Sequence, residues 1–226
     1  MKRSLLSKNE PQQRIAVTFS RGEELKYISH LDMMRLWQRA LRRAGMPIAY
    51  SQGFNPHPRI AIGAPLAVAV TSEGELIDIF MERTVSLDFF VKSMREQLPL
   101  GIGIHGIKEV WLKLPSTQSQ LRFAEYKVEV ESKKEAKEIG KAVRSLIKKE
   151  SLPWEHTRGE SVHRYDIRTL IDDIWIIGQS EYGYTLGMRL RNDSKGSGRP
   201  DQVLRALGFD EPATSIHRIK LILGNN

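Results

Sequence analysis

Hydrophobic positions in the first part of the chain follow two different periods. Residues 14–20 alternate as a strand does, with Ile15, Val17 and Phe19 on one side. Residues 30–44 repeat every three or four positions, which predicts an amphipathic helix. Its buried face should carry Met33, Leu36, Trp37, Ala40, Leu41 and Ala44, and its exposed face Asp32, Arg35, Gln38, Arg39, Arg42 and Arg43.

The ends of this helix are marked by residues that stop or start a helix. Ser29 followed by Asp32 reads as a capping box, so the helix should begin at His30. Gly45 supplies a left-handed cap and Pro47 prevents the helix from resuming. Later patterns predict a short strand and a bend in 60–70, a strand over 75–82, a helix after Ser86, and a strand over 102–114 with Val110, Leu112 and Leu114 facing inward. The order is β-α-β-β-α-β, the split pattern of ferredoxin-like domains.

The second part of the chain repeats this order with one added strand. Residues 121–131 alternate as a strand, and Ser132 with Glu135 reads as a second capping box before a helix that reaches about Lys149. Strands are expected near 162–168, 174–177 and 182–190, then a short helix from Pro200 and a strand over 216–223. The polar segment 115–120 lies between the two parts.

We therefore predict an α+β protein made of two tandem ferredoxin-like subdomains with antiparallel sheets. The expected organisation is a flexible tail over 1–13, a first domain over 14–114, a linker over 115–120, and a second domain over 121–226. The second domain should carry the extra strand.

The amino-acid composition excludes several kinds of catalytic and metal-binding chemistry and favours one kind of partner. The 226 residues include no cysteine, which excludes disulfides, thiolate catalysis and cysteine-bound zinc or iron–sulfur clusters. The net charge of +8 favours an anionic partner. No apolar run reaches the roughly 18 residues of a membrane helix, and the N-terminus lacks a signal-peptide core, so a cytoplasmic protein is expected.

A stiff polar loop follows the first helix. Residues 53–59, GFNPHPR, contain Pro56 and Pro58 on either side of His57, and each proline holds the preceding residue in an extended conformation. Such a loop has little entropy to lose on binding. The candidate binding residues here are the helix arginines Arg35, Arg39, Arg42 and Arg43 together with Ser51, Gln52, Asn55, His57 and Arg59.

Two segments around this loop, SHLDMMRLWQRALRRAGMPIAYSQGFNPHPRI and APLAVAVTSEGELIDI, resemble the radical SAM-associated family of bacterial proteins. RYDIR at 164–168 and RPDQVLRALG at 199–208 fit the same family. The resemblance implies a domain found alone or fused to a B12-binding-type radical SAM protein, and a radical SAM protein as partner. A chain without cysteine cannot hold the usual three-cysteine cluster, so it would act as the partner of such an enzyme.

Further cationic candidates lie in the second part: Arg164 and Arg168, expected on one face of a strand, and Lys195 and Arg199 in the flexible segment 192–199. That segment could wrap a phosphate through backbone N–H groups or could simply connect a hairpin. For catalysis, His30 and His57 are the candidates. At the start of a helix the dipole keeps His30 neutral and able to act as a base, although a satisfied, partly buried histidine is the simpler interpretation.

Three functional readings stay open. The first is a non-catalytic accessory protein that binds RNA or a ribonucleoprotein for a radical SAM enzyme. The second is a metal-independent endoribonuclease with His30 or His57 as base, since tandem ferredoxin-like domains with a basic first helix are similar to CRISPR repeat-processing RNA endonucleases. The third is a plain protein adaptor. No metal-ligand spacing, phosphate-binding loop or nucleotide fingerprint is present, so no metal and no cofactor are expected.

Overall fold

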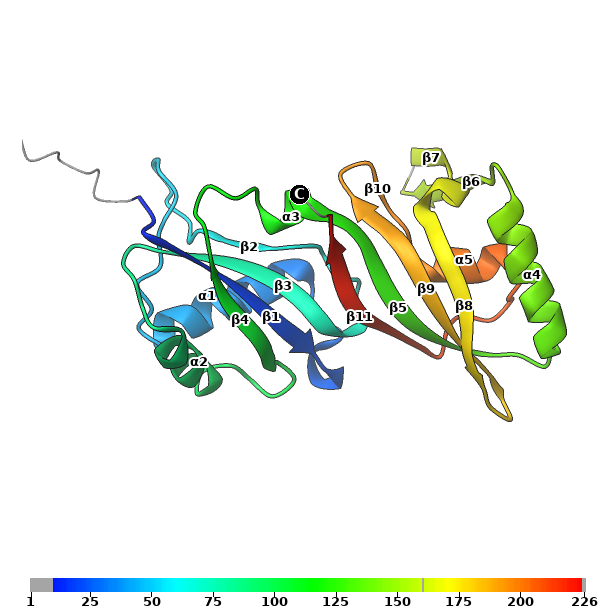
Figure 1. Ribbon diagram of the computed structural model, residues 1–226, viewed down its shortest axis with the longest axis horizontal. Helices are drawn as coiled ribbons and strands as arrows, with labels where there is room; N and C mark the ends of the chain where they lie inside the picture. Colours follow the sequence, from blue (N-terminus) through cyan, green and yellow to red (C-terminus); the bar gives the residue numbers. More distant parts are fainter. Residues whose placement is uncertain (1–9, 160, 225–226) are drawn as a thin grey trace, which may run out of the picture. The chain divides into compact units, whose positions relative to one another are not determined.

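The computed structural model describes residues 10–159 and 161–224, which belong to two compact units that meet in sequence between Gln120 and Leu121 (Figure 1). Each unit has an antiparallel sheet with helices packed on it. The prediction of an α+β protein with antiparallel sheets is confirmed at this level. The predicted tail lies mainly outside the described residues, and its last residue, Gln13, already belongs to the first strand.

The first unit contains four strands, two long helices and two short turns of helix. Its elements are β1 (Gln13–Arg21), η1 (Glu23–Leu25), α1 (His30–Arg43), β2 (Ile60–Ile62), β3 (Thr71–Met81), α2 (Leu87–Arg95), β4 (Ile104–Val110) and α3 (Thr117–Gln120). Within this unit the strands run β2-β3-β1-β4 and every neighbouring pair is antiparallel. The major elements follow the β-α-β-β-α-β order.

One face of this sheet carries the core. Ile15 pairs with Ile79 and Val17 with Ile77, and all four side chains point toward α1 and α2. Helix α1 begins at His30 because Ser29 accepts a hydrogen bond from the amide of Asp32, as predicted. Its face of Met33, Trp37, Ala40 and Leu41 is buried in the same core.

The opposite face is partly closed by the segment that follows β4. We predicted a strand over 102–114, but β4 ends at Val110 and Leu114 is 41% exposed. The reason is a tertiary contact: the guanidinium of buried Arg14 donates to the carbonyl oxygens of Leu114 and Pro115. These bonds turn the chain away from the sheet edge before the short helix α3.

The second unit is built on a long antiparallel pair of strands that are distant in sequence. Its elements are β5 (Leu121–Glu131), α4 (Ala136–Lys148), β6 (Pro153–Arg158), β7 (Ser161–Asp166), η2 (Ile167–Leu170), β8 (Ile171–Gln179), β9 (Gly183–Asp193), β10 (Gly196–Ser197), α5 (Pro200–Ala206) and β11 (Ser215–Leu223). Strand β5 pairs with β9 and β11, and β9 also pairs with β8 and β10. Buried pairs such as Ala124–Leu190 and Val128–Leu186 hold β5 and β9 together.

Three details of the second unit differ from the prediction. The capping box of α4 is formed by Glu135 and Glu138, not by Ser132 and Glu135, so the helix begins at Ala136. Strand β6 was not predicted; it pairs only with β7 in a separate two-stranded hairpin. The strand expected over 162–168 ends at Asp166, because that side chain accepts the amide of Arg168 and starts the turn η2.

Candidate nucleic-acid interface

The outer face of α1 carries four exposed arginines at helical spacing. Arg35 forms an exposed ion pair with Asp32 at 3.2 Å, and Nη2 of Arg43 donates to the carbonyl oxygen of Gln97 at 2.7 Å. Within residues 10–159 and 161–224, Arg39 and Arg42 make no ion pair and no side-chain hydrogen bond. Both guanidinium groups are therefore available to an anionic ligand.

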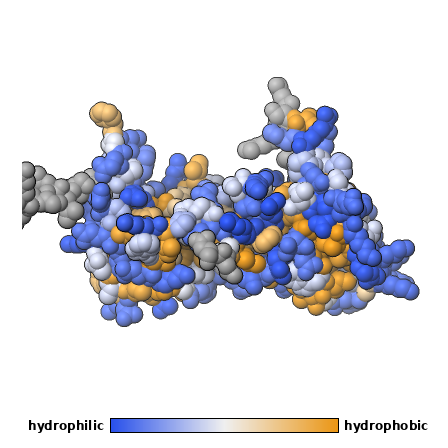
Figure 2. Space-filling view, turned by 45° about the horizontal axis from the view of Figure 1, so that its top comes forward, coloured by the Kyte–Doolittle hydropathy of each residue, from blue (hydrophilic) through white to orange (hydrophobic). Residues whose placement is uncertain are grey.

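The loop after α1 is closed at its base and exposed at its tip. Tyr50 and Pro58 form an antiparallel bridge, the amide of Ser51 donates to the carbonyl of His57, and Oγ of Ser51 accepts the amide of His57 at 2.9 Å. The loop stands out from the unit in Figure 1, and in Figure 2 the projection ends in a hydrophobic residue. Phe54 is the aromatic residue within it, with 112% relative exposure.

This arrangement separates the loop residues by role. The hydroxyl of Ser51 is already hydrogen-bonded within the loop, whereas the side chains of Gln52, Asn55 and His57 are exposed to solvent. Phe54 was missed as a candidate in the sequence. The signal was present, because an aromatic residue between Gly53 and Asn55 in a polar loop has no neighbouring strand or helix to pack on.

Arg59 lies on a different face from the arginines of α1. Ile60 and Ile62 point into the core with the helices, so Arg59 points to the opposite side of the sheet. Its guanidinium lies 4.8 Å from the centre of the Phe80 ring, a cation–π contact. The helix arginines and Arg59 therefore do not share one surface, because the sheet lies between them.

Charge is distributed unevenly along this part of the chain. From Met33 to Ser72 there are five arginines and no aspartate or glutamate. The segment contains most of α1, the exposed loop and Arg59. An anion that approaches this segment meets no carboxylate from it, and the carboxylate of Asp32, just before it, is paired with Arg35.

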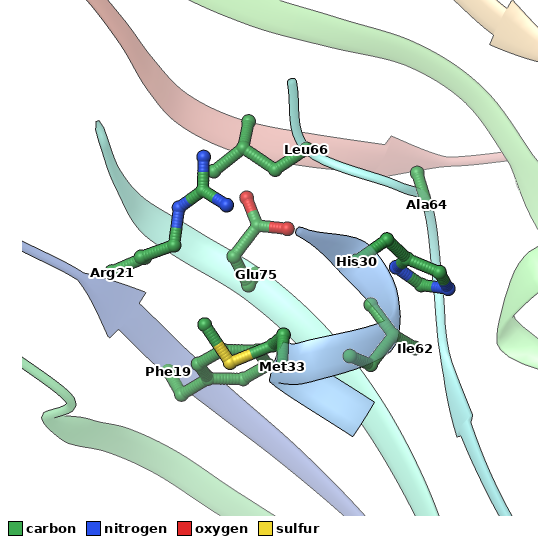
Figure 3. A pocket seen from close by; sticks show the side chains of 8 residues that line it. All are labelled: Phe19, Arg21, His30, Met33, Ile62, Ala64, Leu66 and Glu75. Carbon is green, nitrogen blue, oxygen red and sulfur yellow. The ribbon is translucent and has the colours of Figure 1, made fainter. Parts of the chain in front are cut away.

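His30 faces a narrow pocket together with two buried charged residues (Figure 3). Arg21 and Glu75 are each 2% exposed, and in Figure 3 the Glu75 carboxylate lies between the Arg21 guanidinium and the His30 ring. Burial lowers the pKa of His30, while the negative charge of Glu75 acts in the opposite direction. The neutral form of the His30 imidazole is favoured, as expected from the sequence, but the main cause is burial and not the helix dipole.

The pocket itself is small. Its free volume of about 10 Å³ suits one water molecule, and its walls include Phe19, Met33 and Leu66. Arg21 fixes the wall formed by residues 64–70, since it donates to the carbonyl oxygens of Ala67 and Val70. A ribose does not fit beside His30 in this conformation.

In the second unit, two predicted arginines have structural partners. Arg164 pairs with Glu155 at 2.8 Å on the β6–β7 hairpin. Arg168 is not on that strand: it lies in η2 and donates to the carbonyl oxygens of Ile147, Lys149 and Ile171. The predicted shared strand face of Arg164 and Arg168 is therefore wrong, because Arg168 closes the C-terminal end of α4.

The segment 192–199 is a tight hairpin between β9 and β10. Oδ1 of Asp193 accepts the amides of Lys195 and Gly196, so the N–H groups that could have held a phosphate already have an acceptor. Burial acts to raise the pKa of Asp193, but these amides and Arg191 lower it overall. The side chains of Lys195 and Arg199 are exposed. Of the two interpretations of this segment, a phosphate-binding loop or a hairpin connection, the structure shows the hairpin connection.

The described residues offer neither a metal site nor a membrane-spanning helix. In 10–159 and 161–224, no group of three or more His, Asp or Glu residues is placed to hold a metal ion. No helix in the same part of the chain is long and apolar enough to cross a membrane.

A two-unit α+β protein with an exposed arginine helix and a projecting aromatic loop is thus defined. The family model described as "Uncharacterized protein conserved in bacteria (DUF2344)" matches residues 14–200, and the chain belongs to this family. Among curated proteins, none has a sequence that matches it.

Solved structures show a distant likeness. A chain in "Crystal Structure of a Cbf5-Nop10-Gar1 Complex" has a TM-score of 0.49 and 9% identity, over 92% of this chain and 48% of that chain. A chain in "Crystal structure of the archaeal box H/ACA sRNP Nop10-Cbf5 complex" has a TM-score of 0.46 and 10% identity, over 96% and 50% of the two chains. The protein spans about half the length of these chains.

Proposed function

We propose that this protein is a cytoplasmic accessory protein that binds RNA for a radical SAM enzyme and has no catalytic activity of its own. The observation that carries the RNA part is the exposed pair Arg39 and Arg42 on α1, in a segment of forty residues, 33–72, without a carboxylate. Arginine guanidinium groups pair with phosphates through two parallel hydrogen bonds. The radical SAM part rests on the resemblance of residues 29–60 and 64–79.

The RNA proposal is tested by the salt dependence of binding. We expect the affinity for a mixed-sequence single-stranded RNA to fall linearly with salt on logarithmic axes, by about 0.7 in slope for each phosphate contact. Arg39→Gln combined with Arg42→Gln should reduce the affinity and lower this slope by about 1.4. Fluorescence anisotropy titrations at several salt concentrations measure both quantities.

The matched control is Lys137→Gln combined with Lys141→Gln on the exposed face of α4, which removes the same charge from the second unit. The control should leave the slope unchanged if α1 is the contact surface. Equal losses in the two variants would mean that only net charge matters, and no binding by the unaltered protein at low salt would reject the RNA proposal.

The partner proposal needs a separate experiment. Purification of the tagged protein from native cells, followed by mass spectrometry, should recover a radical SAM protein. Treatment with ribonuclease before capture then separates a direct protein contact from one bridged by RNA. Recovery of RNA without any radical SAM protein would reject this part alone.

A second candidate is a metal-independent endoribonuclease, and one observation favours it. His30 lines the same narrow pocket as Glu75, and burial favours a neutral imidazole that could accept a proton. RNA cleavage in the presence of EDTA that is lost in His30→Ala would support this candidate. Loss in His57→Ala instead would move the base to the loop, and no cleavage by the unaltered protein would reject it.

We also propose that the units are related as tandem ferredoxin-like subdomains, over 14–114 and 121–226 with residues 115–120 as a linker. The β-α-β-β-α-β order and the strand order β2-β3-β1-β4 support this for the first unit. In the second unit, the β5–α4 start and the α5–β11 end support it. Separate expression of 10–120 and 121–224 tests whether each unit folds alone, since each piece should then unfold cooperatively, and the first piece keeps the bonds from Arg14 and Asp78 to Pro115 and Thr117.

A further inference from the structure

The tip of the loop 51–57 exposes its one aromatic side chain completely. Phe54 has 112% relative exposure, the highest among the large exposed hydrophobic residues of the described chain. Burial of a phenylalanine side chain stabilises a folded protein, and the exposed ring of Phe54 contributes none of this to folding. A ligand that covers the ring would recover that free energy.

The loop holds this ring on a stiff support. Pro56 and Pro58 fix their own φ angles and restrict Asn55 and His57. The two hydrogen bonds between Ser51 and His57 close the loop above the Tyr50–Pro58 bridge. Little conformational entropy is left to lose when the ring meets a ligand.

The groups around the ring match an unpaired nucleotide. Gln52 and Asn55 present amides, and His57 an imidazole, each able to donate and accept hydrogen bonds at a base edge. Arg59, at the base of the loop, presents a guanidinium that is already stacked on Phe80. Aromatic stacking combined with a cation and polar side chains is how proteins hold single-stranded RNA.

From this juxtaposition we infer that the loop 51–57 binds unpaired RNA by stacking a base on Phe54, an inference that rests on the proposed RNA-binding function. A duplex hides the faces of its bases within the stack, so the loop selects single-stranded or looped RNA over paired RNA. The absence of carboxylates from 33–72 favours this anionic ligand over a protein pocket for the same ring.

The test compares two RNAs and three variants of the full-length protein. A base stacked on an aromatic side chain contributes about 1–3 kcal/mol, so Phe54→Ala should weaken binding of a single-stranded RNA by about 5- to 150-fold. Its affinity for a duplex of the same sequence should be unchanged. Phe54→Tyr keeps a stacking ring and should bind as the unaltered protein does.

The matched control is Phe89→Ala on α2, which removes another exposed phenylalanine, of 52% relative exposure, and should leave both affinities unchanged. A 2-aminopurine base in the single-stranded RNA reports stacking directly. Its fluorescence should be quenched by the unaltered protein and by Phe54→Tyr, but not by Phe54→Ala. Thermal unfolding should be the same for Phe54→Ala, Phe54→Tyr and the unaltered protein, since the fully exposed Phe54 ring buries no surface in the fold.

The outcomes separate the two ideas. If the unaltered protein binds single-stranded RNA and Phe54→Ala binds it equally well, the stacking inference is overturned and the proposed function stands. An equal loss of single-stranded and duplex binding also overturns it, because a stacked base is not then the cause. If the unaltered protein binds no RNA, the proposed function itself fails. A protein partner lost only in Phe54→Ala, with RNA binding intact, would assign the loop to protein docking and overturn the inference.

Discussion

Arg14 and Asp78 form a buried ion pair across strands β1 and β3, with Nη2 and Oδ2 2.8 Å apart and side chains 3% and 1% exposed. The same carboxylate oxygen accepts the amide of Thr117 at 3.0 Å. Together with the bonds from Arg14 to Leu114 and Pro115, this pair attaches residues 114–117 to the first unit.

Removal of one partner should therefore be costly. Asp78→Ala leaves the Arg14 guanidinium buried without its counter-charge, and we expect the free energy of unfolding of the first unit to fall by about 3–5 kcal/mol. Urea unfolding followed by circular dichroism measures the change. Arg164→Ala breaks the exposed pair with Glu155 and should cost at most about 1 kcal/mol. Similar losses in both variants would contradict this assignment.

The two faces of α1 should differ in the same measurement. Leu41 is 0% exposed, so Leu41→Ala should lower the free energy of unfolding by about 2–5 kcal/mol. Arg39 is exposed, and Arg39→Ala should change stability by less than about 0.5 kcal/mol. The opposite ranking would mean that the helix faces are assigned the wrong way round.

The buried position of His30 predicts a pH dependence of stability. Burial lowers the pKa of His30 in the folded state below its ordinary value of about 6.5, so the unfolded chain binds the proton more tightly. The contribution to stability is complete above that value and is lost as the pH falls through it toward the folded pKa. Unfolding curves between pH 8 and pH 5, roughly the range in which histidine titrates, should show His30→Gln losing less stability than the unaltered protein. His57→Gln serves as the exposed control and should follow the unaltered protein.

Arg168 should contribute to folding and not to RNA binding. Its guanidinium satisfies carbonyl oxygens at the end of α4, and Arg168→Ala leaves these acceptors without their donor. We expect a loss of about 1–3 kcal/mol in the second unit with no change in RNA affinity at matched folded concentration. A variant that is stable but binds RNA more weakly would contradict this role.

Local patterns in the sequence were sufficient for some elements. Helix α1 and strand β5 were predicted to within a residue, because a cap and a regular hydrophobic period are encoded within the element itself. The cap of α4 was misplaced by three residues, because Ser132 and Glu135 match the capping-box motif whereas the observed N-cap residue is Glu135, an uncommon residue at this position.

Long-range contacts could not be predicted in this way. The end of β4 depends on Arg14, about a hundred residues earlier, and the position of Arg168 depends on its acceptors in α4. For the candidate site, the arginines of α1 and the exposed loop were found, since helix period and proline content are local signals. The separation of Arg59 from α1 follows from the sheet that lies between them, which requires the pairing of β2 with β3.

The bridge between Tyr50 and Pro58 closes the loop at its base, so the residues beyond it can change during evolution independently of the sheet. Strands β2 and β3 stay in register whatever connects those two residues, because the core side chains stop at Ala49 before the loop and resume at Ile60 after it. Substitutions at Gln52, Phe54 and Asn55 can thus accumulate without a penalty to folding, whereas Gly53, with φ at +121°, favours glycine. Natural variants of this protein can acquire a new ligand preference through a handful of changes at one tip.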